Sequence, residues 1–122
     1  MVRIDRTRVE ALVDTGAVCS MIAETFARQL RLQIEPVEGP RHNLVSANGS
    51  RMEIAGSAEM ELYIDGAIVE HTVVVARNLT PKLVLGMNFL RSFQANLNFA
   101  SNPPVLTLFD DWITIPMRPG TL

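Results

Sequence analysis

Short apolar stretches alternate with polar breaks along most of the chain. The apolar stretches are rich in β-branched residues, so they predict strands rather than long helices. The Asn48-Gly49 and Asp65-Gly66 pairs are typical of hairpin turns, and further turns are expected at 5–8 and 110–111. The predicted strands are Val2–Ile4, Val9–Val13, Leu44–Ala47, Arg51–Ile54, Glu59–Ile64, Ile68–Ala76, Leu83–Gly86, Val105–Phe109 and Trp112–Pro116.

Two other stretches have helical spacing. The first carries apolar residues on one helix face over 23–30, and we expect Ser20 to cap it, with Glu24 in its first turn. A second short helix is expected after Gly86. Its apolar residues are Phe89, Leu90 and Phe93. The pattern indicates a mainly β fold with two short helices, and the length suits a single domain over 1–122.

Composition and charge narrow the function classes. The net charge is −2 and the basic residues are scattered, which argues against a nucleic-acid partner. The apolar runs are too short to span a bilayer and no leader-like segment opens the chain, so we expect no membrane partner and a cytoplasmic location. Cys19 is the single cysteine and lies far in sequence from His42 and His71, so no disulfide, metal or cofactor is expected. We expect Cys19 to pack as a small residue and both histidines to lie on the surface.

The strongest chemical signal is Asp14-Thr15-Gly16, which follows the apolar stretch 11–13. This tripeptide also ends strands in proteins where it has no catalytic role, because Asp and Gly are common turn residues. Here Gly16 permits a tight turn and Ala17 keeps the space above it small. Farther along, Leu83–Gly86 is a second apolar strand that ends in glycine.

These two segments resemble the two signatures of the retroviral and LTR-retrotransposon aspartic protease family. They read Asp14-Thr15-Gly16-Ala17 and Leu83-Val84-Leu85-Gly86-Met87-Asn88-Phe89-Leu90. The resemblance covers nearly the whole chain. It implies a retropepsin-like half of an acid protease, with a closed barrel-like β-structure, a flap hairpin at Asn48-Gly49 and a C-terminal dimerisation hairpin.

The chemistry of that family requires two carboxylates that share one proton, one accepting a proton from the attacking water and the other donating to the substrate carbonyl. The sequence contains Asp-Thr-Gly once. The resemblance therefore implies a homodimer in which each subunit supplies Asp14, and an endopeptidase that cleaves extended proteins or polyproteins. It also implies that Thr15 braces the two active-site loops and that the Gly16 carbonyl faces the substrate.

The resemblance also implies substrate-binding and dimer-interface residues, which are assigned only from their positions relative to the family's motifs. Ordinary core packing explains the apolar positions equally well. The residues expected to contact substrate are Gly16, Ala17, Met21, Val45, Asn48, Gly49 and Val84. The residues expected at the dimer interface are Thr15, Leu106, Leu108, Trp112 and Ile113.

The sequence departs from the retroviral pattern at Val18 and Met87, where many members carry an Asp and an Arg that form an ion pair. We expect an apolar contact between these two residues in its place, since losing both charges leaves no unpaired buried ion. The second signature ends in Met87-Asn88-Phe89-Leu90, a form that favours a retrotransposon or domesticated retroelement as the source. The protease could then act inside virus-like particles.

Two alternatives remain open. The chain could be a catalytically silent dimerisation or peptide-binding module that has kept the fold. It could also be a strand-rich oligomeric scaffold in which the motif at Asp14 occurs by chance.

Overall fold

The computed structural model describes residues 2–4, 7–36, 43–45, 51–64, 66–77, 79–109 and 113–117. Two compact units divide the chain, unit 1 at Met1–Phe89 and unit 2 at Leu90–Leu122. A single domain over 1–122 stays a prediction.

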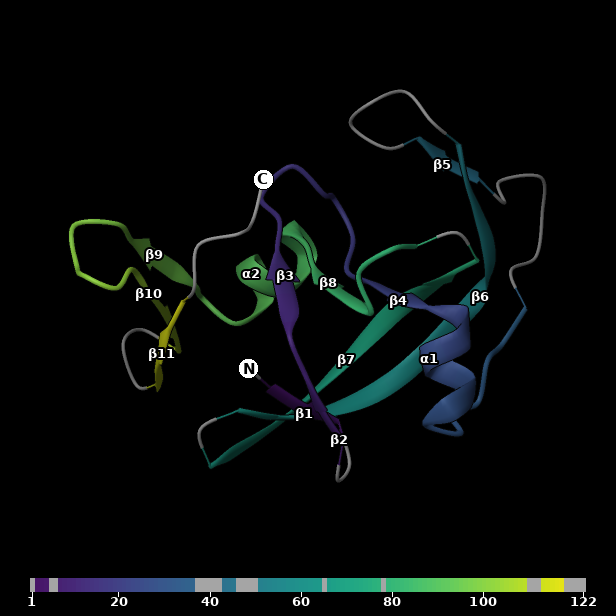
Figure 1. Ribbon diagram of the computed structural model, residues 1–122, viewed down its shortest axis with the longest axis horizontal. Helices are drawn as coiled ribbons and strands as arrows, with labels where there is room; N and C mark the ends of the chain where they lie inside the picture. The colour runs from purple at the N-terminus through teal and green to yellow at the C-terminus, as the bar shows by residue number, and fades with distance from the viewer. Residues whose placement is uncertain are drawn as a thin grey trace. The chain divides into compact units, whose positions relative to one another are not determined.

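Unit 1 is built on one mixed sheet (Figure 1). Its strands are β1 Val2–Ile4, β2 Thr7–Val9, β3 Ala11–Val13, β4 Met21–Ala23, β5 Asn43–Val45, β6 Arg51–Ile64, β7 Ala67–Ala76 and β8 Leu83–Leu85. They follow the order β2-β1-β6-β7-β4-β8-β3, and β5 pairs with β6 outside this path. Strand β4 was not predicted, because the first helix was expected to begin here, with its cap at Ser20 and its apolar face from Ala23.

The centre of the sheet is the antiparallel hairpin of β6 and β7. Its turn contains Gly66 with φ of +83°, a conformation that glycine adopts without steric strain, so the turn predicted here is confirmed. Buried residues alternate with exposed or half-buried ones along β6 from position 58 to 64, which places one face of the strand in the core. The register shifts between Ile54 and Gly56, so β6 is one bulged strand where the sequence predicted two.

The sheet does not close into the predicted barrel. Its ends are β2 and β3, which follow each other along the chain with Glu10 between them. Successive parts of one extended segment cannot lie side by side and pair. Instead β2 pairs with β1, and β3 pairs with β8. This change of partner also divides the strand predicted over Val9–Val13.

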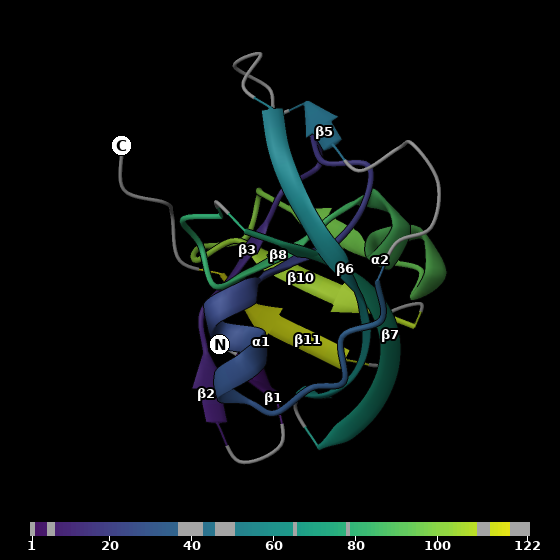
Figure 2. The same cartoon turned by 90° about the vertical axis from the view of Figure 1, so that its right-hand side faces the viewer.

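The predicted hairpin around 48–49 is present in its arms. Strands β5 and β6 pair antiparallel, with Val45 opposite Arg51. The tip, with Asn48 and Gly49, lies outside the described residues. Figure 2 shows β5 and the start of β6 at the opposite end of unit 1 from β1 and β2.

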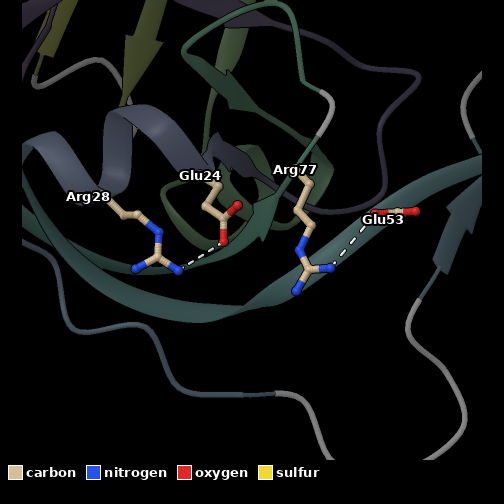
Figure 3. A network of polar contacts seen from close by, with 4 residues as sticks. All are labelled: Glu24, Arg28, Glu53 and Arg77. Atoms are coloured by element: carbon tan, nitrogen blue, oxygen red, sulfur yellow. Dashed lines mark hydrogen bonds and ion pairs between the residues drawn. The ribbon is translucent and has the colours of Figure 1, made fainter.

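Helix α1, Glu24–Gln29, lies against β4 and β7. Its N-cap is Ala23, which has no capping side chain, so the cap predicted at Ser20 is wrong. The reason is that β4 lies between Ser20 and the helix. The expected acidic first turn is present, and Glu24 forms a 3.1 Å ion pair with Arg28 (Figure 3).

The β6–β7 pairing continues beyond the bulge through Glu53 and Arg77. The N–H of Arg77 donates to the carbonyl oxygen of Glu53 at 2.8 Å. Their side chains lie 3.8 Å apart as an exposed ion pair (Figure 3). Such a pair adds little stability, so the backbone bond is the firmer link between β7 and the β5–β6 arms.

Unit 2 contains a three-stranded sheet in the order β11-β10-β9. Its strands are β9 Asn96–Asn98, β10 Val105–Leu108 and β11 Ile113–Pro116. The predicted C-terminal hairpin is therefore confirmed as β10 and β11, while β9 was not predicted. Helix α2, Met87–Ser92, spans the boundary between the units.

Candidate active site

Asp14 lies at the end of β3, beside the second signature segment. Strands β3 and β8 run parallel, with Val13 opposite Leu85. The N–H of Asp14 extends this pairing by donating to the carbonyl oxygen of Leu85 at 3.0 Å. The two segments that carry the resemblance are therefore neighbours in the structure.

The loop after β3 orients the Asp14 carboxylate. Its Oδ1 accepts a 2.8 Å hydrogen bond from the N–H of Gly16. The carbonyl oxygen of Asp14 accepts a 3.2 Å bond from the N–H of Ala17. Within the described part of the chain no hydrogen bond is made to Oδ2. Asp14 is half-buried and Thr15 and Gly16 are exposed, so the carboxylate is held in place but can be reached from outside.

Gly86 lies against this loop with no space for a side chain. A Cβ at this position would lie 2.6 Å from the carbonyl oxygen of Cys19 and 2.8 Å from that of Ala17. Both are backbone atoms, which cannot move without shifting the loop. The second segment therefore needs glycine here for close backbone approach.

Backbone hydrogen bonds join the loop to the start of α2. The N–H of Met87 donates to the carbonyl oxygen of Ala17 at 2.7 Å. The N–H of Asn88 donates to the carbonyl oxygen of Val18 at 3.0 Å. The side chain of Val18 is 79 % exposed. The apolar contact expected between Val18 and Met87 stays a prediction, whereas backbone hydrogen bonds do join the two segments.

A buried hydroxyl, that of Ser20, forms hydrogen bonds with the second signature segment. Ser20 is fully buried, and its Oγ accepts a 3.0 Å hydrogen bond from the N–H of Gly86. The same Oγ donates to Oδ1 of Asn88 at 2.9 Å. That Oδ1 also accepts from the backbone N–H groups of Ser20 and Phe89, each at 2.8 Å. Sequence reasoning gave Ser20 a helix-capping role and missed this one.

His71 completes the cluster around Ser20. Its Nε2 lies 3.2 Å from the Ser20 Oγ, and its ring meets that of Phe89 edge-on with 5.2 Å between centroids. The surface location expected for His71 is wrong, because the side chain is half-buried. Burial lowers its pKa from 6.5, while a hydrogen bond with Asn88 acts in the opposite direction. Its place in the β7 pattern, in line with Val69 and Val73, was a signal that it faces inward.

The residues expected to contact substrate differ in how far they are buried. Ala17 and Met21 are half-buried near the loop, whereas Val84 is buried within unit 1 opposite Met21. Val45 ends β5, where its backbone pairs with Arg51 of β6. Whether any of these residues contacts a substrate stays a prediction.

The residues expected at the dimer interface also stay predictions. Leu106 and Leu108 are already buried in the single chain, so they have little surface left to lose between subunits. Ile113 begins β11, and Trp112 lies outside the described residues. Exposed apolar side chains occur instead near the motif, at Leu12 and Val18.

In the described ranges no three His, Cys, Asp or Glu side chains are grouped as metal ligands would be. No helix in these ranges is long and apolar enough to cross a membrane. Cys19 is half-buried, as expected for a small packing residue.

The fold resembles retroviral protease structures. The retroviral protease-like domain of Ddi1 from Leishmania major aligns with a TM-score of 0.73 and 23% identity, covering 97% of this chain and 90% of that domain. EIAV protease in complex with the inhibitor HBY-793 aligns with a TM-score of 0.58 and 23% identity, covering 75% of this chain and 82% of that protein. These likenesses confirm the retropepsin-like fold.

A family match places the sequence more specifically. Residues 1–92, which include both signature segments, match the family described as "gag-polyprotein putative aspartyl protease". No curated protein matches the sequence at a comparable level. Since the match covers most of the chain and includes Asp14, this chain belongs to the gag-polyprotein aspartyl protease family.

Proposed function

We propose that the protein is a homodimeric aspartic endopeptidase that hydrolyses peptide bonds of extended protein or polyprotein substrates. The observation that carries the proposal is the position of Asp14. It ends β3, bonds to Leu85 of β8 and has one carboxylate oxygen fixed by Gly16. The chain has one Asp-Thr-Gly, so a second carboxylate must come from another copy.

Two Asp14 carboxylates facing each other across a twofold axis would share one proton, because like charges so close cannot both ionise. The ionised carboxylate accepts a proton from water as the water attacks the peptide carbonyl, and the protonated one donates to the carbonyl oxygen. The Gly16 N–H bond to Oδ1 keeps each carboxylate in a fixed orientation during these transfers. Catalysis is then inseparable from dimerisation.

The exposed surface near the motif supports a partner and a substrate on this side. Leu12 and Val18 are apolar and 46% and 79% exposed, and Thr15 between them is exposed as well. We propose that Thr15 contacts the second subunit and that the extended peptide lies along the loop of Gly16. The paired arms β5 and β6 are suited to a flap that covers a peptide by adding backbone hydrogen bonds.

Cleavage of a diverse peptide library at mildly acidic pH tests the proposal. The wild-type chain should cleave, and a statine-type inhibitor, which imitates the attacked carbonyl, should stop it. Asp14→Asn should abolish cleavage while the protein stays folded and dimeric by light scattering. Glu61→Gln, on an exposed position of β6, is the matched control and should cleave like wild type.

Undiminished cleavage by purified Asp14→Asn would contradict the mechanism. A folded dimer that binds peptides and cleaves none would instead identify a silent peptide-binding module.

A further inference from the structure

The hydroxyl of Ser20 uses all of its hydrogen-bonding capacity. A serine hydroxyl has one donor and two acceptor positions. Three groups surround this one, namely the Gly86 N–H, Asn88 Oδ1 and His71 Nε2, at 3.0, 2.9 and 3.2 Å. Each position can therefore be assigned from the chemistry of the partner.

The Gly86 N–H can only donate, so it takes one acceptor position. Asn88 Oδ1 can only accept, and its identity as the oxygen is fixed by the two backbone N–H groups that also point to it. The Ser20 proton must therefore point to Asn88, since two lone pairs facing each other at 2.9 Å would repel. One acceptor position remains, and His71 Nε2 lies 3.2 Å from it, so the contact needs a proton on Nε2. The hydrogen bond of His71 with Asn88 is consistent with this proton, because Asn88 Oδ1 can only accept.

We infer that His71 is a positioning residue of the active site. Its Nε2–H occupies the last acceptor position of the Ser20 hydroxyl and helps to hold that hydroxyl in the orientation in which its proton points to Asn88. The hydroxyl so fixed holds Gly86 in place. The kinetic part of this inference rests on the proposed function, whereas the tautomer and the hydrogen-bond network do not.

Gly86 connects this cluster to the catalytic carboxylate by one peptide unit. Leu85 precedes it, and the Leu85 carbonyl oxygen accepts the N–H of Asp14 at 3.0 Å. Gly86 also packs directly on Cys19 and Ala17 of the Asp14 loop. A displacement of Gly86 therefore moves the loop on one side and the Asp14 backbone on the other.

The acidic residues nearest in register face away from the His71 ring. His71 pairs with Met60 of β6, which is buried. Glu59 and Glu61 flank Met60, and Glu70 precedes His71, and all three are exposed on the opposite face of the sheet. On α2, whose Phe89 contacts the ring, Arg91 is also exposed. Burial lowers the pKa of His71, which favours the neutral imidazole with one N–H that the network requires.

Two substitutions separate the donor from the shape of the ring. His71→Gln keeps an N–H donor at nearly the place of Nε2 and cannot titrate. His71→Phe keeps a flat ring against Phe89 and removes the donor. Glu70→Gln, one residue away and exposed on the other face, is the matched control.

We expect His71→Phe to lower kcat about tenfold with little change in KM, because a misplaced carboxylate affects the chemical step more than peptide binding. His71→Gln should stay within about threefold of wild type, like Glu70→Gln. Full kcat in His71→Phe, or an equal loss in His71→Gln, would overturn the inference.

Nitrogen NMR of the imidazole tests the network without any activity. In wild type and in Asp14→Asn, the signals that disappear in His71→Gln should show a proton on Nε2 and none on Nδ1 at pH 7.5. Exchange of the Gly86 amide should be faster in His71→Phe than in His71→Gln. A proton on Nδ1, or equal exchange in the two variants, would contradict the inference. If the wild-type chain cleaves no peptide, the proposed function fails while these NMR results still decide the role of His71.

Discussion

The N–H of Asp14 donates to the carbonyl oxygen of Leu85 at 3.0 Å, one residue past the last pair of the parallel strands β3 and β8. This bond joins the catalytic motif directly to the end of β8. Gly86 follows Leu85 and packs on the loop that follows Asp14. The placement of the carboxylate is therefore sensitive to changes at Gly86 and at the groups that hold it.

The first prediction concerns Gly86→Ala. The added Cβ would lie 2.6 Å from the backbone of Cys19, so we expect a loss of about 1–3 kcal/mol in unfolding free energy together with lower activity. Urea denaturation measures the first and peptide cleavage the second. Gly66→Ala is the control, since its Cβ meets nothing within 4 Å and its cost of about 1–2 kcal/mol comes from the positive φ alone, with activity retained. Unchanged activity in Gly86→Ala would contradict the tight packing.

The second prediction concerns Ser20→Ala. The change leaves the Gly86 N–H without its buried acceptor, so we expect a loss of about 1–3 kcal/mol in unfolding free energy. Ser57→Ala is the control, because backbone groups of Ser57, not its hydroxyl, make its hydrogen bonds to Glu35. Equal midpoints of urea denaturation for Ser20→Ala and Ser57→Ala would contradict the role of the hydroxyl.

The third prediction concerns pH and follows from the lowered pKa of His71. The unfolded chain binds a proton near pH 6.5, whereas the folded chain binds it only at lower pH. The contribution to stability is therefore complete above pH 6.5 and is lost as pH falls through the folded-state pKa. Urea denaturation at a series of pH values should show this loss in wild type and a smaller one in His71→Gln. Identical pH dependence in the two proteins would contradict it.

The fourth prediction concerns Leu108, which was expected at the dimer interface and is fully buried in the single chain. Leu108→Ala should lower the unfolding free energy by about 2–5 kcal/mol, as a cavity in a core does, without a specific loss of dimer affinity. Sedimentation of the folded variant measures the affinity. Phe99→Ala, at a position 70% exposed, should change stability by no more than about 0.5 kcal/mol. A large rise in the dimer dissociation constant with little loss of unfolding free energy would show instead that Leu108 lies at the dimer interface.

Periodicity and turn residues predicted most of the sheet. The long β6–β7 hairpin and its turn at Gly66 were predictable because alternation and an Asp-Gly turn agree there. The site at Asp14 followed from a short motif whose chemistry needs those residues. The match over residues 1–92 confirms the family that these features indicated.

Other features depended on contacts between distant segments. Serine is a common helix-capping residue, so the local sequence suggested that role for Ser20. Its hydroxyl instead forms hydrogen bonds with Gly86 and Asn88 from the second segment. Strand β4 exists because it inserts between β7 and β8, which no local pattern specifies. The absence of a closed barrel among the described strands likewise reflects a change of pairing partner at Glu10.

Mixing wild-type chains with Asp14→Asn chains tests the central claim most directly. At a fixed total concentration well above the dissociation constant, random exchange makes about a quarter of the dimers wholly wild type in an equal mixture. If each subunit supplies one Asp14, the cleavage rate should fall as the square of the wild-type fraction, to about a quarter of the undiluted rate. A rate that falls only in proportion to the wild-type fraction, to about half, would show that one chain carries a complete active site and would contradict the account.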